Sequence, residues 1–477
     1  MSVLLGLSIM GLILNILFSL SLIFIERKDP TTTWAWLLIL LVLPGIGFMI
    51  YILFGQNLSR QKIFKEKIRV DEVKRKNINE KYEGDIQKHD GGERFSDLRK
   101  MNFNQSGAKY TTNNNANVYV NGDDKFKQLI EDIKNAERYI HIEYYIFKDD
   151  LIGKIIINEL TKKAKVGLEV RLLVDSMGSR KFTKKAIKEY LDSGGKFSFF
   201  FPGILPHINT RINYRNHRKI VIIDGEYGYV GGFNVGKEYI NKDPEVGFWR
   251  DTHVRIKGEA VEDLNERFLL DWCHASNEEI KDYDKYVPKG NSVVGDIGIQ
   301  IVTSGPDHKE QYIRNAYIKL INNAKENVYL ETPYLVPDSP ILEALKISAL
   351  SGVDVRIIIP GKPDHFFMQW VASSYIGELL EAGIKIYKYE NGFIHAKTIV
   401  VDSTVISIGT ANLDIRSFKL NFEVNAFIFD DRIAKDGETQ FMKDIEESEE
   451  VIKEVYDNRS ISIRIKESLI RLVSPIL

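Results

Sequence analysis

Two stretches of the sequence carry the same reactive residue types in the same order. The first, at 214–236, reads YRNHRKIVIIDGEYGYVGGFNVG, and the second, at 393–414, reads FIHAKTIVVDSTVISIGTANLD. They share the pattern His-x-Lys-x4-Asp-x6-Gly-x2-Asn, and each residue of the second copy follows its counterpart by 178 positions. The pattern residues are His217, Lys219, Asp224, Gly231 and Asn234, then His395, Lys397, Asp402, Gly409 and Asn412. One copy would be a weak signal, but two in register indicate a functional site.

The charges around the first histidine allow two interpretations. Arg215, Arg218 and Lys219 could form a basic surface patch, or they could line a pocket for an anion. Alternate side chains of an extended strand share a face, so each histidine points the same way as the lysine two positions later. The second copy keeps its histidine and lysine but has no flanking arginine. This favours the anion pocket and gives Lys219 more weight than the two arginines.

Paired histidines and lysines suit displacement at a phosphodiester. The transition state spreads negative charge over the phosphoryl oxygens, and fixed cations and N–H donors stabilise it. A neutral imidazole can attack phosphorus to give a covalent phosphohistidine. A protonated imidazole can donate to the leaving alcohol and later accept the proton of the acceptor. The phosphate-binding candidates are Lys219, Lys397, Asn234 and Asn412. No dense set of Asp, Glu and His ligands accompanies them, so we expect neither a metal nor a cofactor.

The composition limits the classes of function. The 477 residues suffice for two or three domains, and 65 basic residues almost cancel 66 acidic ones. This balance provides no global positive field, so we expect no nucleic-acid partner. The single cysteine, Cys273, excludes an intramolecular disulfide and a multi-cysteine metal site.

The chain after about residue 106 alternates between strand-like and helix-like segments, which predicts an α/β fold. This rhythm then repeats: 318–336 parallels 130–147, and 352–360 parallels 167–175. Such internal similarity predicts a duplicated domain with a boundary near 290. We therefore expect one α/β domain at 106–290 and a second at 291–477, each contributing one motif.

The N-terminus predicts a transmembrane helical hairpin at 1–56. Apolar runs at 3–25 and 34–54 are each long enough to cross a bilayer, and the first lacks the features of a signal peptide. Eight basic residues follow the second run and two lie between the runs, which predicts cytoplasmic catalytic domains. These eight are Arg60, Lys62, Lys65, Lys67, Arg69, Lys74, Arg75 and Lys76. The charged linker at 57–105 could contact anionic headgroups or form a solvated helix. The amphipathic C-terminal segment could lie in a membrane interface or pack on the globular domain.

The two motifs resemble those of the phospholipase D superfamily, in which two α/β domains meet at a pseudo-twofold interface and share one active site. Other stretches narrow the resemblance to bacterial cardiolipin synthases. They are ERKDPTTTWAWLLILLVLPGIGFMIYILFGQN, FWRDTHVRIKGEAV and GTANLDIRSFKLNFEVNAFIFD. The resemblance implies a bacterial membrane enzyme that transfers a phosphatidyl group between two phosphatidylglycerol molecules. It also implies His217 as nucleophile and His395 as acid and base. A membrane-bound phospholipase D acting by hydrolysis is the alternative, and the oligomeric state stays open.

Several other polar residues need an interpretation. By resemblance, Asp251 and Glu423 hold the tautomers of the motif histidines, as a third group does in other activated pairs. The motif aspartates Asp224 and Asp402 are carried over with the catalytic residues, although their strand-end positions favour pairing with backbone or a neighbouring cation. Glu143 and Glu331 match across the repeat and could serve either the pocket or a structural ion pair. The patterns around His141 and His253 favour core or surface positions.

Overall fold

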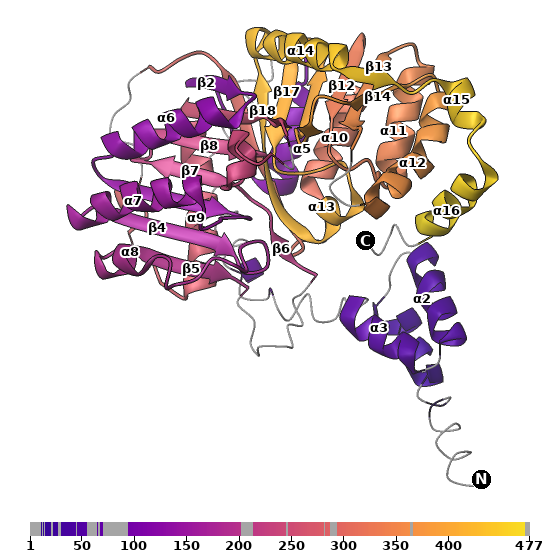
Figure 1. Ribbon diagram of the computed structural model, residues 1–477, viewed down its shortest axis with the longest axis horizontal. Helices are drawn as coiled ribbons and strands as arrows, with labels where there is room; N and C mark the ends of the chain where they lie inside the picture. Colours follow the sequence, from indigo (N-terminus) through magenta and orange to yellow (C-terminus); the bar gives the residue numbers. More distant parts are fainter. Residues whose placement is uncertain are drawn as a thin grey trace.

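The computed structural model describes residues 94–201, 213–244, 247–280, 282–286, 293–362 and 366–472, together with parts of 11–69. The remainder of the predicted linker and the 202–212 stretch lie outside the described residues. Two α/β halves sit side by side, and the N-terminal helices extend from one end of this body (Figure 1). The expected α/β class and the expected division into two halves are confirmed.

The first half is a seven-stranded mixed sheet with helices on both faces. In spatial order its strands are β2 (Asn114–Tyr119), β10 (His253–Gly258), β8 (Tyr227–Gly231), β7 (Ile220–Ile223), β3 (Tyr139–Tyr144), β4 (Glu169–Asp175) and β5 (Lys196–Phe200). Its helices are α6 (Gly122–Asn135), α7 (Leu151–Lys165), α8 (Lys188–Asp192) and α9 (Ala260–Ser276). The side chains of Asn121 and Asp150 cap α6 and α7 by accepting backbone N–H groups of the first turn.

The second half repeats this strand order. Its corresponding strands are β11 (Gly298–Ser304), β18 (Asn421–Phe429), β17 (Val405–Gly409), β16 (Thr398–Val401), β12 (Asn327–Glu331), β13 (Asp354–Pro360) and β14 (Lys385–Tyr389). The edge strands β1 (Tyr110–Thr111) and β19 (Ser448–Glu450) extend this sheet. Its main helices are α10 (Tyr312–Asn322), α11 (Ser339–Leu350), α12 (Phe366–Glu381) and α14 (Asp431–Glu446). The repeat read from the sequence is thus a repeat of topology.

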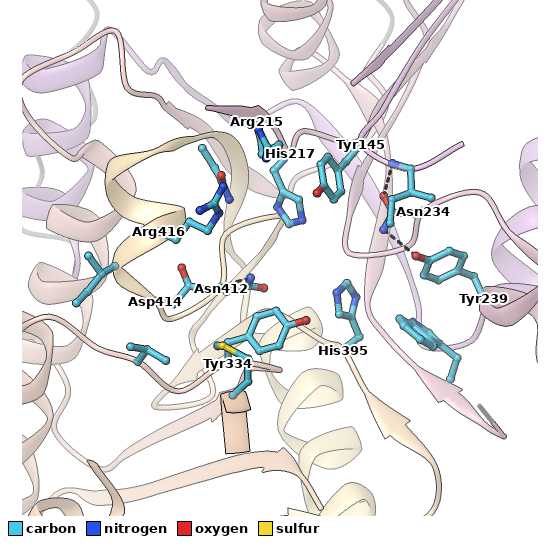
Figure 2. Close-up of a pocket in the computed structure, with 16 residues that line it drawn as sticks. Tyr145, Arg215, His217, Asn234, Tyr239, Tyr334, His395, Asn412, Asp414 and Arg416 are labelled. Atoms are coloured by element: carbon cyan, nitrogen blue, oxygen red, sulfur yellow. Dashed lines mark hydrogen bonds between the residues drawn. The ribbon is translucent and has the colours of Figure 1, made fainter. Parts of the chain in front are cut away.

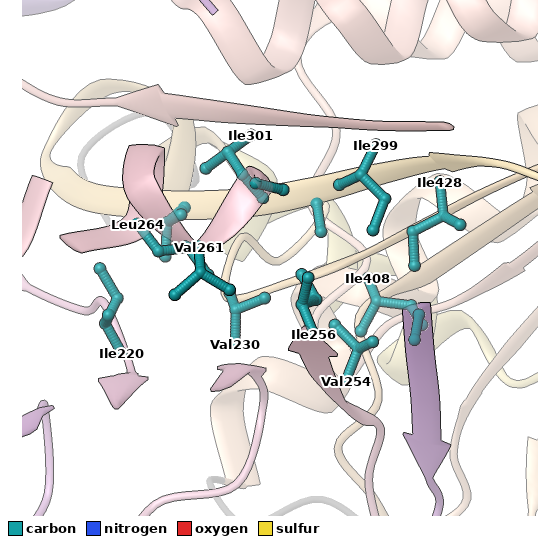
Figure 3. Packing of buried hydrophobic residues seen from close by; sticks show 14 of the residues in the cluster. Ile220, Val230, Val254, Ile256, Val261, Leu264, Ile299, Ile301, Ile408 and Ile428 are labelled. Carbon is teal, nitrogen blue, oxygen red and sulfur yellow. The ribbon is translucent and has the colours of Figure 1, made fainter. Parts of the chain in front are cut away.

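The inner faces of the two sheets share one hydrophobic core. Figure 3 shows Val254 and Ile256 of the first sheet close to Ile408 and Ile428 of the second, and all four are fully buried. Such strands read as nearly continuous apolar runs because both faces of each sheet are covered. Burial of apolar surface between the sheets therefore holds the halves in a fixed relation, which a shared active site requires.

Short strands also cross between the halves. β6 (Arg215–Asn216) pairs with β18 in parallel, and β9 (Trp249–Arg250) pairs with β15 (Phe393–Ile394) in the same sense. In addition, α5 (Ser96–Ser106) packs on α10, and β1 pairs with β11. The elements α5 and β1, which lie on either side of the expected domain start at about residue 106, thus contact the second half.

The N-terminal segment contains α2 (Pro30–Val42) and α3 (Ile46–Phe54), together with a short π-helix at Leu22–Glu26. Trp36 and Leu40 are buried against Tyr51 and Leu22. Within the described residues, no helix combines the length and the apolar character needed to cross a bilayer.

One of the eight basic residues after the second apolar run contacts neither headgroups nor solvent, the two alternatives predicted for the charged linker. Lys67 is buried, and its Nζ lies 2.6 Å from a carboxylate oxygen of Asp307. This residue therefore pairs within the protein, because a buried ammonium group needs a charged partner. Its neighbour Phe64 is also buried and packs against Tyr214 and Phe422.

The chain ends in α15 (Lys453–Asp457) and α16 (Ile461–Arg471), which pack on α12. Arg471 of α16 binds Glu378 of α12, which helps to fix this contact. Arg459, which lies between α15 and α16, binds the buried Glu467 of α16. Ile470 of α16 is half-buried and packs against the core of the second half, but the other apolar residues of the helix are exposed. They are Ile461, Ile463, Ile465 and Leu469, and the following Leu472 is exposed as well. The interpretation that this segment packs on the globular domain is thus confirmed, and the interpretation that it lies in a membrane interface stays a prediction.

Candidate active site

The crossing ladders place each motif histidine beside a strand of the opposite half. In the first ladder Asn421 pairs with Arg215, and Phe422 pairs with Asn216. One step further along the same register brings His217 opposite Glu423, and the His217 N–H donates to the Phe422 carbonyl at 2.9 Å. In the second ladder the same step brings His395 opposite Asp251, and its N–H donates to the Arg250 carbonyl at 2.7 Å.

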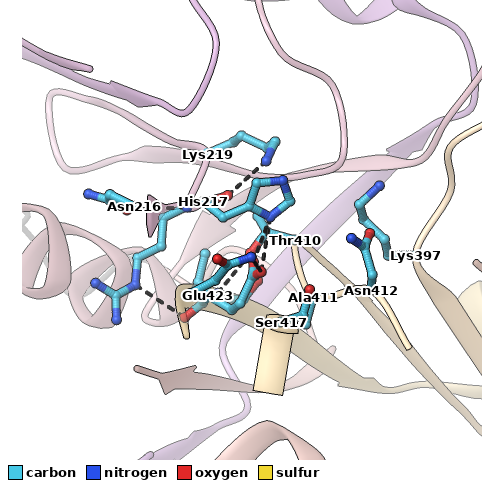
Figure 4. A network of polar contacts seen from close by, with 12 residues as sticks. Asn216, His217, Lys219, Lys397, Thr410, Ala411, Asn412, Ser417 and Glu423 are labelled. Carbon is cyan, nitrogen blue, oxygen red and sulfur yellow. Dashed lines mark hydrogen bonds and ion pairs between the residues drawn. The ribbon is translucent and has the colours of Figure 1, made fainter. Parts of the chain in front are cut away.

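Each histidine contacts a buried carboxylate across the interface. Nδ1 of His217 lies 2.9 and 3.0 Å from the two carboxylate oxygens of Glu423 (Figure 4). Nδ1 of His395 lies 2.6 Å from Oδ2 of Asp251. Glu423 and Asp251 are both fully buried. The first half thus holds the histidine of the second, and the second half holds the histidine of the first.

This pairing fixes which imidazole nitrogen is free to react. A charged carboxylate only accepts hydrogen bonds, so Nδ1 carries the hydrogen and Nε2 keeps its lone pair. Both rings point into one pocket, with Tyr145 beside His217 (Figure 2). An imidazole held in this way can act as a nucleophile or as a base.

Burial controls the charge of both rings. Burial is the largest influence on the pKa of His217. Burial and the Lys219 charge lower this pKa to about 4, although the Glu423 carboxylate acts to raise it. Burial and then Lys397 likewise lower the pKa of His395 to about 4, although Asp251 opposes them. In the unoccupied site both imidazoles are therefore neutral at pH 7. Burial raises the pKa of Glu423, but the surrounding cations and hydrogen bonds prevail, and it lies below its usual value.

The motif lysines lie behind the histidines. Nζ of Lys219 donates to the backbone carbonyl of His217 at 2.7 Å, and Nζ of Lys397 donates to that of His395 at 2.5 Å. Burial lowers the pKa of Lys219 to about 7, and Lys397 adds to this effect. In this arrangement the lysines contribute positive field next to the rings, and neither is among the residues that line the pocket.

The two motif asparagines do line the pocket. Oδ1 of Asn234 accepts the Ile146 N–H, and its Nδ2 donates to the Tyr239 hydroxyl at 3.1 Å. Nδ2 of Asn412 donates to Asp414 at 3.2 Å. The sequence therefore brings His217, Asn234, His395 and Asn412 to one cavity.

The motif aspartates have backbone partners. The carboxylate of Asp224 accepts the N–H groups of Glu137, Arg138 and Tyr139 at 2.7–2.9 Å. Asp402 accepts those of Lys325, Glu326 and Asn327, each at 2.7 Å. Both aspartates have positive φ, at 58° and 52°, which Asp tolerates better than most residues. Each aspartate therefore joins the turn after its motif strand to the start of a central strand, β3 or β12. This is the backbone-pairing role that its position in the sequence favoured.

Three other polar candidates, Arg218, Glu331 and Glu143, do not line the cavity. Arg218 is buried, and its guanidinium lies 2.5 Å from Asp271. Glu331 forms an ion pair with Arg250 at 3.3 Å. Glu143 accepts a hydrogen bond from Asn216.

The two histidines outside the motifs, His141 and His253, are fully buried, as the core interpretation predicted.

The cavity has a volume of about 520 Å³, within the range of small-molecule sites. Aromatic rings form much of its wall: the rings of Tyr145 and His217 are 4.9 Å apart, and those of Trp249 and His395 are 5.2 Å apart. Sequence reasoning missed these aromatic residues because they lie outside the motif. It also missed Arg416, although that residue follows the second motif closely. The full lining is Tyr145, Ile146, Arg215, His217, Asn234, Tyr239, Trp249, Tyr334, Val336, Met368, His395, Asn412, Asp414, Ile415, Arg416 and Asn421.

Metal ligands were also sought around this cavity. Among the residues that the structure describes, no three His, Cys, Asp or Glu side chains gather as metal ligands would. That the reaction uses no metal and no cofactor stays a prediction.

Known proteins are similar to this chain over nearly its whole length. A family model described as "Cardiolipin synthase, PLD-like domain" matches residues 129–272 and 317–445, so that each matched segment contains one motif. "Cardiolipin synthase" of Clostridium perfringens strain SM101 is 53% identical over 457 residues, covering 95% of this chain and 96% of that protein. The chain belongs to the cardiolipin synthase family. "Major cardiolipin synthase ClsA" of Bacillus subtilis strain 168 is 48% identical over 475 residues, 98% of each chain.

Membership of the cardiolipin synthase family makes the chain a phosphatidyltransferase of phospholipid biosynthesis. A second family model, described as "Phospholipase_D-nuclease N-terminal", matches residues 13–56. Among solved structures, phosphatidylserine synthase of Haemophilus influenzae superimposes with a TM-score of 0.60 at 15% identity, covering 80% of this chain and 100% of that one. At this identity the likeness shows a shared fold.

The two kinds of motif-associated carboxylate should respond differently to substitution. Asp251→Asn keeps the size of the residue but removes the charge that fixes the His395 tautomer, so activity should fall by about 10²- to 10⁴-fold. Asp224→Ala leaves three backbone N–H groups without their acceptor, so stability should fall by at least about 1–3 kcal/mol. Denaturant unfolding and activity per folded molecule measure the two effects. A loss of activity in folded Asp224→Ala as large as that in Asp251→Asn would contradict the distinction.

Proposed function

We propose that this cardiolipin synthase uses phosphatidylglycerol as both donor and acceptor of the phosphatidyl group. The observation that carries the proposal is the pair of histidines at one cavity, each with Nδ1 on a buried carboxylate of the opposite half. Two imidazoles with free Nε2 atoms suit a reaction that needs one nucleophile and one proton carrier. The products are cardiolipin and glycerol, and no energy source is required because one phosphodiester replaces another.

In the first step, Nε2 of His217 attacks the phosphorus of the donor lipid. The phosphorus–oxygen bond to the headgroup glycerol breaks as the phosphorus–nitrogen bond forms. Protonated His395 gives its Nε2 proton to the departing glycerol oxygen, so glycerol leaves as a neutral alcohol. Asn234 and Asn412 face the phosphate from the cavity wall, and Lys219 and Lys397 add positive field from behind the rings, which stabilises the charge on the phosphate oxygens. The assignment of His217 as nucleophile follows the family resemblance.

In the second step, neutral His395 accepts the proton of a terminal hydroxyl of the second phosphatidylglycerol. The resulting oxygen attacks phosphorus, the bond to His217 breaks, and cardiolipin forms. Water competes with this hydroxyl for the intermediate. The aromatic wall of Tyr145, Trp249 and Tyr334 favours transfer because it limits the room for water beside the phosphohistidine.

The product distribution tests the assignment. Purified protein in detergent with phosphatidylglycerol alone should yield cardiolipin and free glycerol in equal amounts, measured by lipid chromatography and a glycerol assay. His217→Ala and His395→Ala should each lower the rate by at least about 10³-fold, because residues that act as a unit are each indispensable. Wild-type protein that makes phosphatidic acid but no cardiolipin would sink the proposal.

The lowered histidine pKa values predict an unusual pH profile. The value of kcat/KM reports the free enzyme, in which the first step needs His395 protonated although its pKa is about 4. Above that pKa the protonated fraction rises about tenfold for each pH unit of acidification. In non-ionic micelles, kcat/KM should therefore rise as pH falls from 7 towards 5. The bound phosphate raises the imidazole pKa, so kcat should vary less.

A donor that needs no proton provides the control for this profile. With a p-nitrophenyl ester of phosphatidic acid as donor, the leaving group departs as an anion. The tenfold change per pH unit that His395 causes should then disappear, which leaves only the weaker dependence from Lys219, whose pKa is about 7. A flat profile for phosphatidylglycerol between pH 5 and pH 7 would contradict the role of His395.

The same proposal includes the membrane topology. It keeps the hairpin predicted from the apolar runs at 3–25 and 34–54 as the anchor in the bacterial cell membrane, although α2 and α3 divide the second run in the structure. The excess of basic residues after these runs places the catalytic halves in the cytoplasm. The exposed apolar residues of α16 support contact with the membrane surface, and Arg464 and Lys466 on the same helix suit anionic headgroups. In Figure 1, α16 lies on the side of the body from which the N-terminal helices extend.

Substitution on α16 tests this contact. The double variant Ile465→Asp and Leu469→Asp removes two apolar side chains, each worth about 1.5–3 kcal/mol when transferred from water. Activity should fall at least about tenfold on anionic vesicles but remain on short-chain phosphatidylglycerol below its micelle concentration. Val166→Asp, at an exposed site of the first half, is the matched control. Equal loss on both substrates would show that α16 acts only within the protein.

A further inference from the structure

The two arginines that flank His217 lie in different environments. Arg215, His217 and Lys219 alternate along an extended segment, so their side chains share a face. Arg215 accordingly lines the cavity, whereas Arg218 points the other way and is buried against Asp271. The sequence comparison gave both arginines little weight because the second motif lacks them. The structure separates them: Arg215 is a residue of the cavity.

A second arginine of the cavity comes from the opposite half. Arg416 lies in α13 (Ile415–Lys419), directly after the second motif, and donates to the backbone carbonyl of Asn213 at 3.0 Å. Arg215 donates to the carbonyl of Tyr214 at 2.9 Å. These bonds orient both guanidinium groups at the cavity, and Arg215 also hydrogen-bonds Tyr145, whose ring lies beside His217. Figure 2 shows both arginines on the side of His217 away from Asn234 and Tyr239.

The positions related by the repeat carry no cations. The same 178-residue offset that aligns the motifs relates Arg215 to Phe393 and Arg416 to Glu238. Phe393 is a buried aromatic residue, and Glu238 is buried with its carboxylate 2.5 Å from Nζ of Lys148. The histidines, lysines and asparagines are thus symmetric, but the arginine pair exists on one side of the site only. Because the arginine pair is present on one side of the site only, the two lipids that the site binds meet different residues.

The charges around the arginine pair favour an added anion. Burial lowers the pKa of Arg416, and the neighbouring charge of Arg215 lowers it further. The carboxylates Asp414 and Asp175 oppose this effect, yet the pKa of Arg416 stays below its usual value, and both carboxylates also have backbone partners. Asp175 accepts the N–H groups of Met177, Gly178 and Asn216, and Asp414 accepts that of Ser417. An anion between the two guanidinium groups would relieve their repulsion.

The chemistry of transfer requires a place for such an anion. A hydrolase handles one phosphodiester, but transfer between two glycerophospholipids brings a second one into the same cavity. The second phosphate is separated from the attacking hydroxyl by a single glycerol unit, so it must lie close to the reacting phosphorus. Guanidinium forks match phosphate oxygens in geometry and charge.

We propose that Arg215 and Arg416 form a subsite for the phosphodiester of the second lipid, the one that does not react at phosphorus. The subsite rests on the proposed use of phosphatidylglycerol as acceptor. It gives the synthase its preference for a lipid hydroxyl over water or free glycerol. Phe393 and Glu238 leave the symmetry-related side without this capacity, so the arginine side is the acceptor side.

The test compares two reactions of the same intermediate. Exchange of labelled glycerol into phosphatidylglycerol needs only the reacting phosphate, whereas cardiolipin formation also needs the second. The variants Arg215→Gln and Arg416→Gln should lower the ratio of cardiolipin formation to glycerol exchange by about 10- to 100-fold, as expected for the loss of a charged hydrogen bond. Arg416→Lys, which keeps the charge but loses the fork, should give an intermediate ratio. Exchange in each sample reports that the variant is folded.

Arg432→Gln is the matched control, because this arginine is exposed and pairs with Asp430 and Asp296 away from the cavity. Its ratio should equal that of the wild type. An equal fall of exchange and synthesis in the Arg215 and Arg416 variants would overturn the subsite, since the arginines would then hold the reacting phosphate. Wild-type rates of both reactions in these variants would overturn it as well. In both cases cardiolipin formation by the wild type would still support the proposed function.

Discussion

The site depends on one exchange between the halves: each motif histidine takes its carboxylate from the opposite domain. This exchange follows from backbone register. The ladder of β6 with β18 places His217 opposite Glu423, and the ladder of β9 with β15 places His395 opposite Asp251. Neither half alone can hold its histidine in the reactive tautomer. The shared core between the sheets is therefore part of the catalytic apparatus, because it fixes the distance over which the two pairs form.

Burial gives the exchanged pairs their chemical character. A histidine beside a carboxylate would ordinarily gain a proton, yet burial and the neighbouring lysines keep both rings neutral until a substrate arrives. The phosphate brings the negative charge that can stabilise a protonated imidazole. In the proposed reaction, substrate binding and proton uptake are thus coupled, and the near-symmetric site becomes asymmetric when a substrate binds. The arginine pair adds a second asymmetry that is built into the sequence.

Much of this arrangement could be predicted from the sequence, and the misses have physical reasons. The repeated motif and the apolar strands predicted two α/β halves, because repetition and periodicity are local properties. The orienting roles of Asp251 and Glu423 came from resemblance, but their crossing between halves depends on strand register far apart in the chain. The backbone role of Asp224 could be inferred from its place at a strand end. Alternation along the strand could have separated Arg215 from Arg218, whereas the burial of Lys67 depends on Asp307, which lies 240 positions away.

The covalent intermediate provides the most direct test of the central claim. Wild-type protein mixed with phosphatidylglycerol for a short time and quenched at high pH, where a phosphorus–nitrogen bond to histidine survives, can be digested and examined by mass spectrometry. The account predicts a peptide whose His217 carries the phosphatidyl group, and none in Glu423→Gln. With the p-nitrophenyl donor, whose leaving group needs no acid, it predicts more of this peptide in Asp251→Asn. An adduct on His395, or an adduct on His217 that survives in Glu423→Gln, would contradict the crossed assignment.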